Sequence, residues 1–458
     1  MAGLFGLLDV VSGGLAAQQF GLGVTGQNVS NANTPQYMRR VALLETQAGP
    51  GVQIQGQQQV SDTYADRAFL NATSLQSSAS ELDGNLATIE NLFNDSAGTG
   101  LGSSLNQLFG VFQQLSTNPS DPTVRQSVLN AAGQFTTRAN GIAGSIATQR
   151  TDLHNKAEQL AKEANDKSQQ VAKLNQQIVE AQMAGRDASG LIDQRNKVLL
   201  GLSQILNVQV IAGANGSVTV QAGGTTLVDG AMTRSVSVGL DDSGNLTYLA
   251  QRTGSNDVPS DITATVTGGS LAGVKQARDV DLAQVATQFD SFIFDVGTAL
   301  NTQHAAGVGL DGQSGRILFD LPSTSVGAGQ LISVSADVAG QPANIAAASD
   351  SAALPGDSSN AVLLSQLSSS PVVGGTQSPA DAYGALVGTV GTLRAASQSD
   401  VSLRQGILQQ ATAARESISG VSMDEEMVNL QKYQEAYQAN GKLLTVVNGL
   451  LQDLLNAV

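Results

Sequence analysis

Hydrophobic residues recur every seven positions at both ends of the chain. Near the start, the repeating positions are Leu8, Leu15, Leu22 and Val29, with Leu4 and Val11 on a neighbouring seam. Near the end, one unbroken register holds Met423, Leu430, Tyr437, Leu444, Leu451 and Val458, and a second seam holds Tyr433, Val447 and Leu454. A seven-residue repeat is typical of a helix that packs lengthwise against another helix. The pattern therefore predicts two long terminal helices.

Both terminal segments are nearly uncharged, and the first is rich in glycine. Asp9 is the only charged residue among the first 34, and Asp453 is the only one after Lys442. The predicted first helix contains Gly13, Gly14, Gly21 and Gly23. Each interior glycine costs a helix roughly 1 kcal/mol relative to alanine, so this helix is marginal alone. We expect the terminal helices to pair with each other, with neighbouring subunits, or with both.

The middle of the chain has helical periodicity over long stretches. Helices are predicted at 61–90, 101–115, 123–184, 191–206, from 280 to about 303, and at 380–417. Pro122 and Asp121 mark the start of the longest helix as first-turn proline and cap. Prolines then accumulate between Pro322 and Pro379. We expect residues 306–378 to be irregular, with short strands at 317–321 and 331–336.

A different periodicity interrupts the helices after residue 206. Valines alternate with other residues on both sides of the turn sequence Ala214–Ser217, and a second pair of alternating runs flanks Asp241–Asn245. Alternation around Gly-containing turns indicates β-hairpins. Residues 207–274 are therefore predicted to be a small β-rich insert in a helical chain.

These patterns together predict a mainly α member of the α+β class. We expect a long helical bundle, with both termini forming a coiled-coil-like assembly domain. The predicted division is 1–60 plus 419–458 for the assembly domain, 61–206 plus 275–418 for the bundle, and 207–274 for the insert.

Composition narrows the possible functions. The 458 residues are 41% hydrophobic but only 4% aromatic, and the net charge is −15. This acidic balance argues against nucleic-acid binding, which requires a basic stripe. Cysteine is absent, so disulfides, thiol catalysis and cysteine metal sites are excluded. The apolar start has no basic leader, and no apolar run reaches eighteen residues, so we expect neither a Sec signal nor a membrane span.

Motifs for catalysis or cofactor binding are weak. His154 and His304 lie far apart and have no metal-ligand spacing. Gly21–Gly26 matches GxGxxG, but helical sequence precedes it where a dinucleotide site needs a strand. Gly268–Gly273 misses the GxSxG pattern by one position. The sequence therefore predicts no catalytic residue, no metal and no cofactor, and we do not expect an enzyme.

The most specific string is Asn28-Val29-Ser30-Asn31-Ala32-Asn33-Thr34-Pro35 followed by Tyr37. It concentrates side chains that form hydrogen bonds at a helix end, before a proline that prevents the helix from continuing. The string resembles the N-terminal signature of axial flagellar proteins, the rod, hook and hook-associated types. Gln36 stands where that signature commonly has glycine.

Further strings resemble one branch of these proteins, the FlgK family of hook-associated proteins. They are Leu191-Ile192-Asp193-Gln194-Arg195 with Leu202-Ser203, then Asn301-Thr302-Gln303-His304, and the C-terminal block Ser419–Glu426, Asn429–Gln431 and Tyr437–Asn440. The resemblance covers both ends and the helical middle, and it is weak in 306–378. Rod and hook proteins resemble this chain chiefly at the N-terminal signature and less at Ser419–Asn440.

This resemblance implies a structural junction protein of the bacterial flagellum, located outside the cell and exported by the flagellar type III apparatus. The implied partners are the hook protein, the second hook-associated protein and other copies of the chain in a ring. The free protein is expected to be a monomer whose residues 1 to about 55 and 425–458 are poorly ordered. The expected assembly residues are Leu8, Leu15, Leu22, Val29, Asn28, Asn31, Asn33, Thr34, Tyr37, Met423, Leu430, Tyr437, Leu444 and Leu451.

Two other functions remain open from the sequence. The chain could be a hook or distal rod protein, which shares the N-terminal signature. It could also be a hydrolase carried on an axial flagellar scaffold, although residues 207–274 and 306–378 contain no nucleophile or metal motif.

Overall fold

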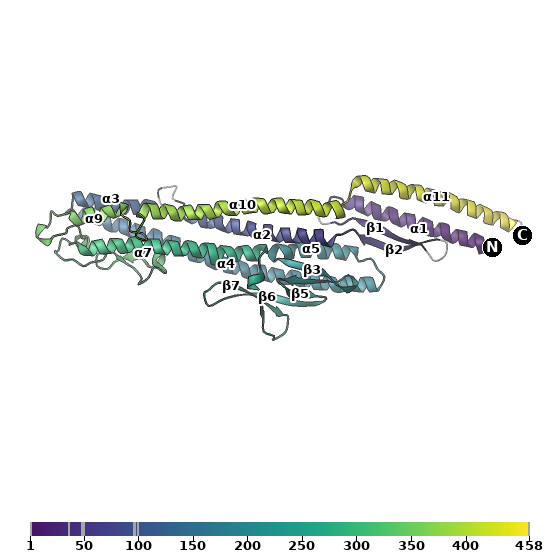
Figure 1. Ribbon diagram of the computed structural model, residues 1–458, viewed down its shortest axis with the longest axis horizontal. Coiled ribbons are helices and arrows are strands. Elements are labelled where there is room, and N and C mark those ends of the chain that lie inside the picture. Colours follow the sequence, from purple (N-terminus) through teal and green to yellow (C-terminus); the bar gives the residue numbers. More distant parts are fainter. Residues whose placement is uncertain (1, 35–36, 47–50, 95–97, 99, 457–458) are drawn as a thin grey trace.

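The chain folds into an elongated rod of helices with both termini at one end (Figure 1). The computed structural model describes residues 2–34, 37–46, 51–94, 98 and 100–456, and within these it leaves out the side chains of Ala2, Leu4, Leu454 and Leu455. The mainly α prediction is confirmed: long helices run along the rod, and strands form three small sheets among the described residues.

The end that holds the termini consists of two helices and a hairpin. Helix α1 (Ala2–Asn31) lies against helix α11 (Met423–Asn456), as the heptads predict. Strands β1 (Arg40–Thr46) and β2 (Val52–Gln59) form an antiparallel pair beside α1. This hairpin was not predicted, because β2 reads Val-Gln-Ile-Gln-Gly-Gln-Gln-Gln and has few apolar residues to reveal alternation.

The bundle is built from α2 (Thr63–Leu92), α3 (Leu101–Thr117), α4 (Pro122–Met183), α5 (Ser189–Ile205), α7 (Leu282–Ala306) and α10 (Pro379–Ser419). All six helices were predicted, with ends within about three residues of those observed. The predicted cap is present, since the Asp121 carboxylate accepts a hydrogen bond from Thr123 N. Asp62 caps α2 in the same way through Tyr64 N and Ala65 N.

One continuous hydrophobic core runs through the bundle and into the insert. Its largest fully buried apolar side chains include Phe112, Phe135 and Phe289. Within the described residues, this core contains no member of α1 or α11. The terminal helices are therefore stabilised by their own contacts and by the polar contacts described below.

The insert is a six-stranded antiparallel sheet whose strands follow chain order. The strands are β3 (Val208–Ala212), β4 (Val218–Ala222), β5 (Thr225–Asp229), β6 (Met232–Leu240), β7 (Leu246–Arg252) and β8 (Ser260–Asp261). Both predicted hairpins are present. The strands end at Asp261, and the last part of 207–274 forms helix α6 (Gly269–Lys275) against α2. Gly269 has φ +76°, and a Cβ there would lie 2.2 Å from the carbonyl carbon of Ile205.

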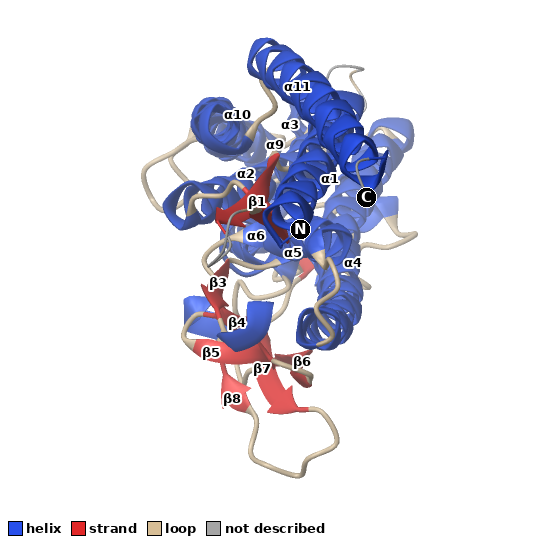
Figure 2. Ribbon diagram, turned by 90° about the vertical axis from the view of Figure 1, so that its right-hand side faces the viewer, coloured by secondary structure: helices blue, strands red, loops and turns tan. Residues whose placement is uncertain are grey.

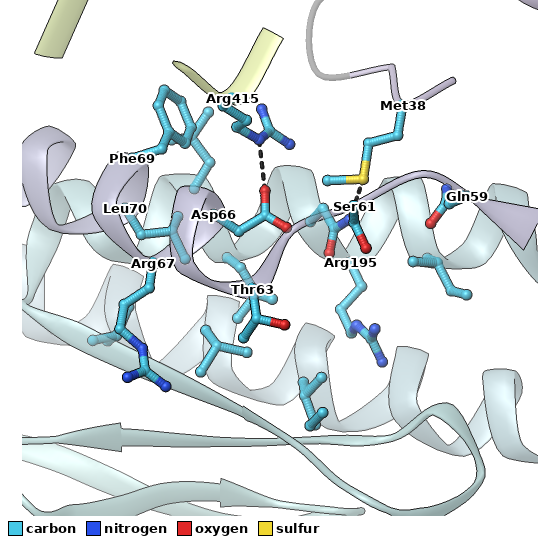
Figure 3. A pocket seen from close by; sticks show the side chains of 18 residues that line it. Met38, Gln59, Ser61, Thr63, Asp66, Arg67, Phe69, Leu70, Arg195 and Arg415 are labelled. Carbon is cyan, nitrogen blue, oxygen red and sulfur yellow. Dashed lines mark hydrogen bonds and ion pairs between the residues drawn. The ribbon is translucent and has the colours of Figure 1, made fainter. Parts of the chain in front are cut away.

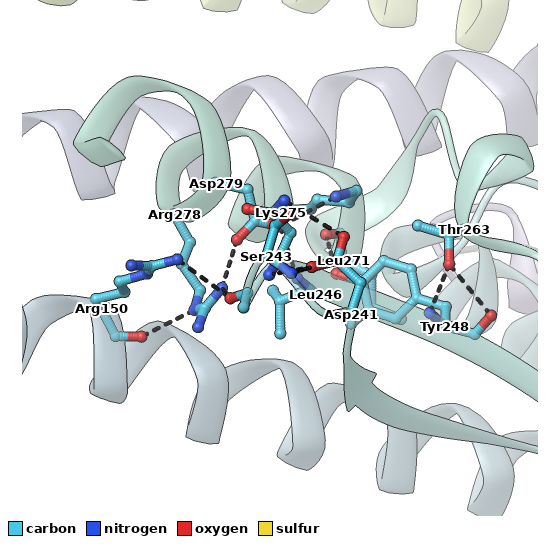
Figure 4. A network of polar contacts seen from close by, with 12 residues as sticks. Arg150, Asp241, Ser243, Leu246, Tyr248, Thr263, Leu271, Lys275, Arg278 and Asp279 are labelled. Atoms are coloured by element: carbon cyan, nitrogen blue, oxygen red, sulfur yellow. Dashed lines mark hydrogen bonds and ion pairs between the residues drawn. The ribbon is translucent and has the colours of Figure 1, made fainter. Parts of the chain in front are cut away.

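A buried polar network attaches the insert to the rod (Figure 4). A π-helical segment, Gln276–Asp281, follows α6 and carries Asp279, whose side chain is 3% exposed. Its carboxylate accepts hydrogen bonds from Leu246 N at 2.8 Å, from Lys275 Nζ at 3.0 Å and from Arg278. Arg278 also donates to the Gly244 carbonyl oxygen of the insert and to the Arg150 carbonyl oxygen of α4. These contacts fix the sheet rigidly on the helices.

The far end of the rod contains the irregular region 306–378. Short strands occur within both predicted segments, β9 (Phe319–Asp320) and β10 (Ser333–Val334), and they pair antiparallel, which was not predicted. Two short helices, α8 (Ala328–Leu331) and α9 (Ser359–Gln366), were not predicted there.

Two buried basic side chains organise this irregular end. Arg125 is 1% exposed and donates to the carbonyl oxygens of Pro119 and Ile345, each at 2.6 Å. His304 is fully buried between the carbonyl oxygen of Arg316, 2.7 Å from Nδ1, and Ala346 N, which donates to Nε2 at 3.0 Å. These contacts bring together backbone segments that have little regular structure.

Candidate assembly interface

Helices α1 and α11 run antiparallel and touch at glycines spaced seven residues apart. Gly21 faces Tyr433, and Gly14 faces Asn440. A Cβ at Gly21 would lie 2.6 Å from Tyr433 Cε1, and one at Gly14 would lie 3.0 Å from Asn440 Nδ2. These glycines therefore allow the close approach of the helices. Gly23, by contrast, has no described atom within 4 Å of such a Cβ.

The predicted seam of α1 lies beside this contact line. Its four predicted members, Leu8, Leu15, Leu22 and Val29, are half-buried. The fully buried positions of the helix are Val11, Ala17, Gly21, Val24, Thr25 and Asn28. The residues of α1 that contact α11 thus lie about one position away from the predicted seam and have smaller side chains. Part of each larger seam side chain therefore stays accessible to another molecule.

On α11 the two predicted seams have unequal burial. Leu430, Leu444 and Leu451 of the first seam are half-buried, whereas Met423 and Tyr437 are 46% and 41% exposed. Val447 of the second seam is 4% exposed, and Tyr433 contacts Gly21. Predicted positions at Val458 and at the side chains of Leu4 and Leu454 lie outside the described residues. The role of these residues in assembly remains a prediction.

The Asn-rich signature clamps the chain where it leaves α1. The Asn28 side chain donates through Nδ2 to the Arg40 carbonyl oxygen at 2.8 Å. Its Oδ1 accepts hydrogen bonds from Arg40 N at 3.0 Å and from the Tyr37 hydroxyl at 2.9 Å. Burial raises the pKa of Tyr37, so its hydroxyl remains a donor at neutral pH. Asn28 therefore fixes the start of β1 against the end of α1.

The other signature residues shape the turn after α1. Asn31 Nδ2 donates to the Gln27 carbonyl oxygen at 2.9 Å, and the Thr34 hydroxyl donates to Asn31 Oδ1 at 3.2 Å. Asn33 is exposed. Pro35 and Gln36 lie outside the described residues. The signature thus combines a buried clamp with an exposed turn.

Arg39 joins the hairpin to the corner between α10 and α11. Its guanidinium lies 2.8 Å from Glu425 Oε2 and 2.8 Å from Glu426 Oε1. The Glu426 side chain is only 2% exposed, so water screens this second ion pair weakly. Arg39 N also donates to the Ser419 carbonyl oxygen at 2.9 Å. Three parts of the chain are therefore held together at one residue.

Asp193 on α5 connects the terminal helices and hairpin to the bundle. Its carboxylate accepts hydrogen bonds from Arg40 and from Gln59 Nε2. Burial raises the pKa of Asp193, although both partners oppose that shift. Arg195, from the same predicted motif, points instead to the insert and donates to the Gly216 carbonyl oxygen at 2.6 Å. The motif thus links α5 to both of its neighbours, a role that its spacing alone did not reveal.

Large hydrophobic side chains are exposed along the outer face of α11. Leu443, Val446 and Leu450 are 52%, 58% and 50% exposed, and their spacing places them on one face. Other exposed apolar residues at this end are Phe5, Leu7, Met427 and Val428. Exposed apolar side chains grouped on one helix face are typical of a surface that another molecule covers. The sequence signal for this surface was the lack of charge in both terminal helices.

The residues considered for chemistry do not form a site. His154 Nε2 lies 3.6 Å from Glu158 one helical turn away, and His304 is buried at the far end of the rod. The GxGxxG string lies within α1 and follows helix, not strand. Among the described residues, no group of three or more His, Cys, Asp or Glu side chains is placed to hold a metal. No described helix is long and apolar enough to cross a membrane.

Comparisons with known proteins agree with this architecture. "Flagellar hook-associated protein 1" of Salmonella typhimurium (strain LT2) is 25% identical over 561 aligned residues, which cover 98% of this chain and 99% of that protein. The protein of the same name from Bacillus subtilis (strain 168) is 26% identical over 506 aligned residues, which cover 100% of this chain and 99% of that protein. The solved "flagellar hook junction protein FlgK from Burkholderia pseudomallei" has a TM-score of 0.68 and 17% identity, covering 77% of this chain and 100% of that one. This likeness confirms the fold class.

Two family models match different parts of the chain. The "Flagellar basal body rod FlgEFG protein C-terminal" model matches residues 414–457. The C-terminal block is therefore shared with rod proteins, and the expectation that it separates them from junction proteins is wrong. The distinguishing match is the "Flagellar hook-associated protein FlgK helical domain" at residues 86–319, just over half of the chain. The chain belongs to the FlgK family of flagellar hook-associated proteins.

Proposed function

We propose that this chain is a structural subunit of the junction between the flagellar hook and filament, where it self-assembles into a ring. The proposal follows the family membership and the name "flagellar hook junction protein" of the solved relative. Its partners are the hook protein on one side, the second hook-associated protein on the other, and copies of itself.

The observation that carries the proposal is the structure of α1 and α11. This pair lies at one end of the rod, outside the described continuous core, and exposes large apolar side chains on α11. A subunit that functioned alone would expose this surface to water at an unfavourable free energy. Contacts with neighbouring subunits would bury it, so the terminal helices are the proposed assembly element.

We further propose a solution state, an export route and a division into domains for this chain. The free chain is a monomer with weakly stable terminal helices, which order fully on assembly. It is exported through the flagellar type III route and acts outside the cell. Residues 1–60 plus 419–458 form the assembly domain, 61–206 plus 275–418 the bundle, and 207–274 the insert with its supporting helix. The chain acts by structure and not by catalysis.

Deletion of the gene tests this function directly. Cells without the chain should build hooks of normal length, lack filaments and release flagellin into the medium, because the filament has no base on which to form. Electron microscopy of the cells and immunoblots of the medium measure both effects, and plasmid expression of the chain should reverse them. Loss of the hooks themselves would support a hook or rod function instead, and normal filaments would contradict the proposal.

A further inference from the structure

A cavity lies where the terminal hairpin, the bundle and the insert meet (Figure 3). Its volume is about 210 Å³, and its walls come from the start of α2, from α5, from β3 and β4, and from the end of α10. Much of the lining is apolar, including Leu70, Leu199, Val208 and Val210. The cavity exceeds the volume of an aliphatic side chain and has a mouth near the exposed Thr63.

The cavity carries positive charge in an otherwise acidic protein. Arg195 is 6% exposed, its Nε has no hydrogen-bond partner among the described residues, and its guanidinium contacts only neutral oxygens there. Arg67 is exposed and has no described ion-pair partner. Arg415 also lines the cavity, and Asp66, the one carboxylate in the lining, lies 2.7 Å from its Nε. The lining therefore favours an apolar group with a carboxylate beside it.

The insert presents that chemistry on its most prominent loop. The connection between β7 and β8 projects away from the helices (Figure 2). It carries Val258, which is 90% exposed, more than any other exposed large hydrophobic residue among those described. The neighbouring Asp257 is exposed, and its carboxylate has no described partner. An apolar side chain and a free carboxylate thus stand together at the tip.

We propose that the cavity receives the Asp257–Val258 loop of a second copy of the chain. Val258 of one subunit enters among the apolar walls, and Asp257 meets Arg67 at the mouth. Cavity and loop are different surfaces of one chain, so the contact is heterologous, and such contacts form a ring when the rotation between subunits closes. In Figure 1 the insert lies at the same level along the rod as the first part of α2, so subunits arranged side by side bring the insert of one near the cavity of the next. This inference rests on the proposed ring.

Cysteine crosslinking in assembled flagella tests the contact. The chain has no cysteine, so Thr63→Cys and Val258→Cys together introduce the only thiols of the chain. After mild oxidation of isolated hook–filament structures, we expect a ladder of disulfide-linked multimers on a non-reducing gel. The single variants should remain monomeric. A matched pair, Thr63→Cys with Val326→Cys, should also give no ladder, because Val326 is 79% exposed but lies in the irregular region at the far end.

Exchanging the two charges in the double-cysteine chain provides a second test of the contact. Arg67→Glu should reduce the ladder severalfold by repelling Asp257, and adding Asp257→Arg should restore it. Immunoblots of the same preparation distinguish the possible failures. A chain that is present in the flagella but gives no ladder would overturn this contact alone. A chain that is absent from the flagella would overturn the proposed function and this inference with it.

Discussion

Replacing Gly21 with alanine probes the packing of α1 on α11 at its tightest point. The new Cβ would lie 2.6, 2.7 and 2.9 Å from three ring carbons of Tyr433. Ordinary carbon–carbon contacts are about 3.5–4.0 Å, so the ring or the helix must move. Overpacking of this kind costs about 1–3 kcal/mol. Alanine also stabilises the helix itself by about 1 kcal/mol relative to glycine.

Gly23→Ala is the matched control, two residues along the same helix. It brings the same gain in helix stability without a described neighbour to clash with. The two variants should therefore differ by about 1–3 kcal/mol in the opening free energy of the pair, equivalent to about 5- to 150-fold in exchange rate. Hydrogen exchange followed by mass spectrometry on peptides from both helices measures this difference in the free chain.

The wild-type baseline of this experiment is itself informative. Because the described continuous core excludes α1 and α11, their amides should exchange much faster than those of the bundle. Tyr433→Ala in the Gly21→Ala chain should recover part of the loss by making room for the new methyl group. Equal exchange in Gly21→Ala and Gly23→Ala would refute the packing register described here.

Three further predictions concern single side chains. Leu444→Asp should leave the melting temperature of the bundle unchanged. Cells that carry it should still export the chain and build hooks but shed flagellin, because assembly would bury a carboxylate in place of a leucine at a cost of several kcal/mol. His154→Ala should leave swimming in soft agar and thermal stability unchanged, since this half-buried residue has no catalytic role in our account; lost motility at normal stability would reopen an enzymatic function. Burial lowers the pKa of His304. The free energy of unfolding measured with urea should therefore be constant above pH about 6.5 and fall below it, because the unfolded chain takes up the proton first. His304→Gln should remove that part of the pH dependence, and an identical pH profile in this variant would contradict the assignment.

The helices could be predicted because their signals are local. Heptads, caps and prolines mark α1, α4, α10 and α11, and valine alternation marks the insert hairpins. Hairpin β1–β2 could not be predicted, because glutamine occupies the positions where apolar alternation would appear. Its place is set by long-range contacts, chiefly Asn28 with Arg40 and Arg40 with Asp193, which a single sequence does not reveal.

The candidate interface was predictable in position but not in register. The seven-residue repeat located the correct helices, yet the contact line follows Gly14 and Gly21, because small residues permit the closest approach. The heptad leucines of α1 therefore flank the contact instead of forming it. Of the glycines first counted as a cost to α1, Gly14 and Gly21 allow close packing on α11, and Gly13 allows close packing on the Val52 carbonyl oxygen of β2. The facing residues alone make these roles apparent.

If the chain occupies the junction between hook and filament, immunogold labelling of intact flagella will locate it there. An epitope tag placed after Gly224, in the exposed turn between β4 and β5, would mark the insert. We expect one narrow band of gold where hook meets filament, and none elsewhere. Gold along the whole hook, along the rod or along the filament would contradict it.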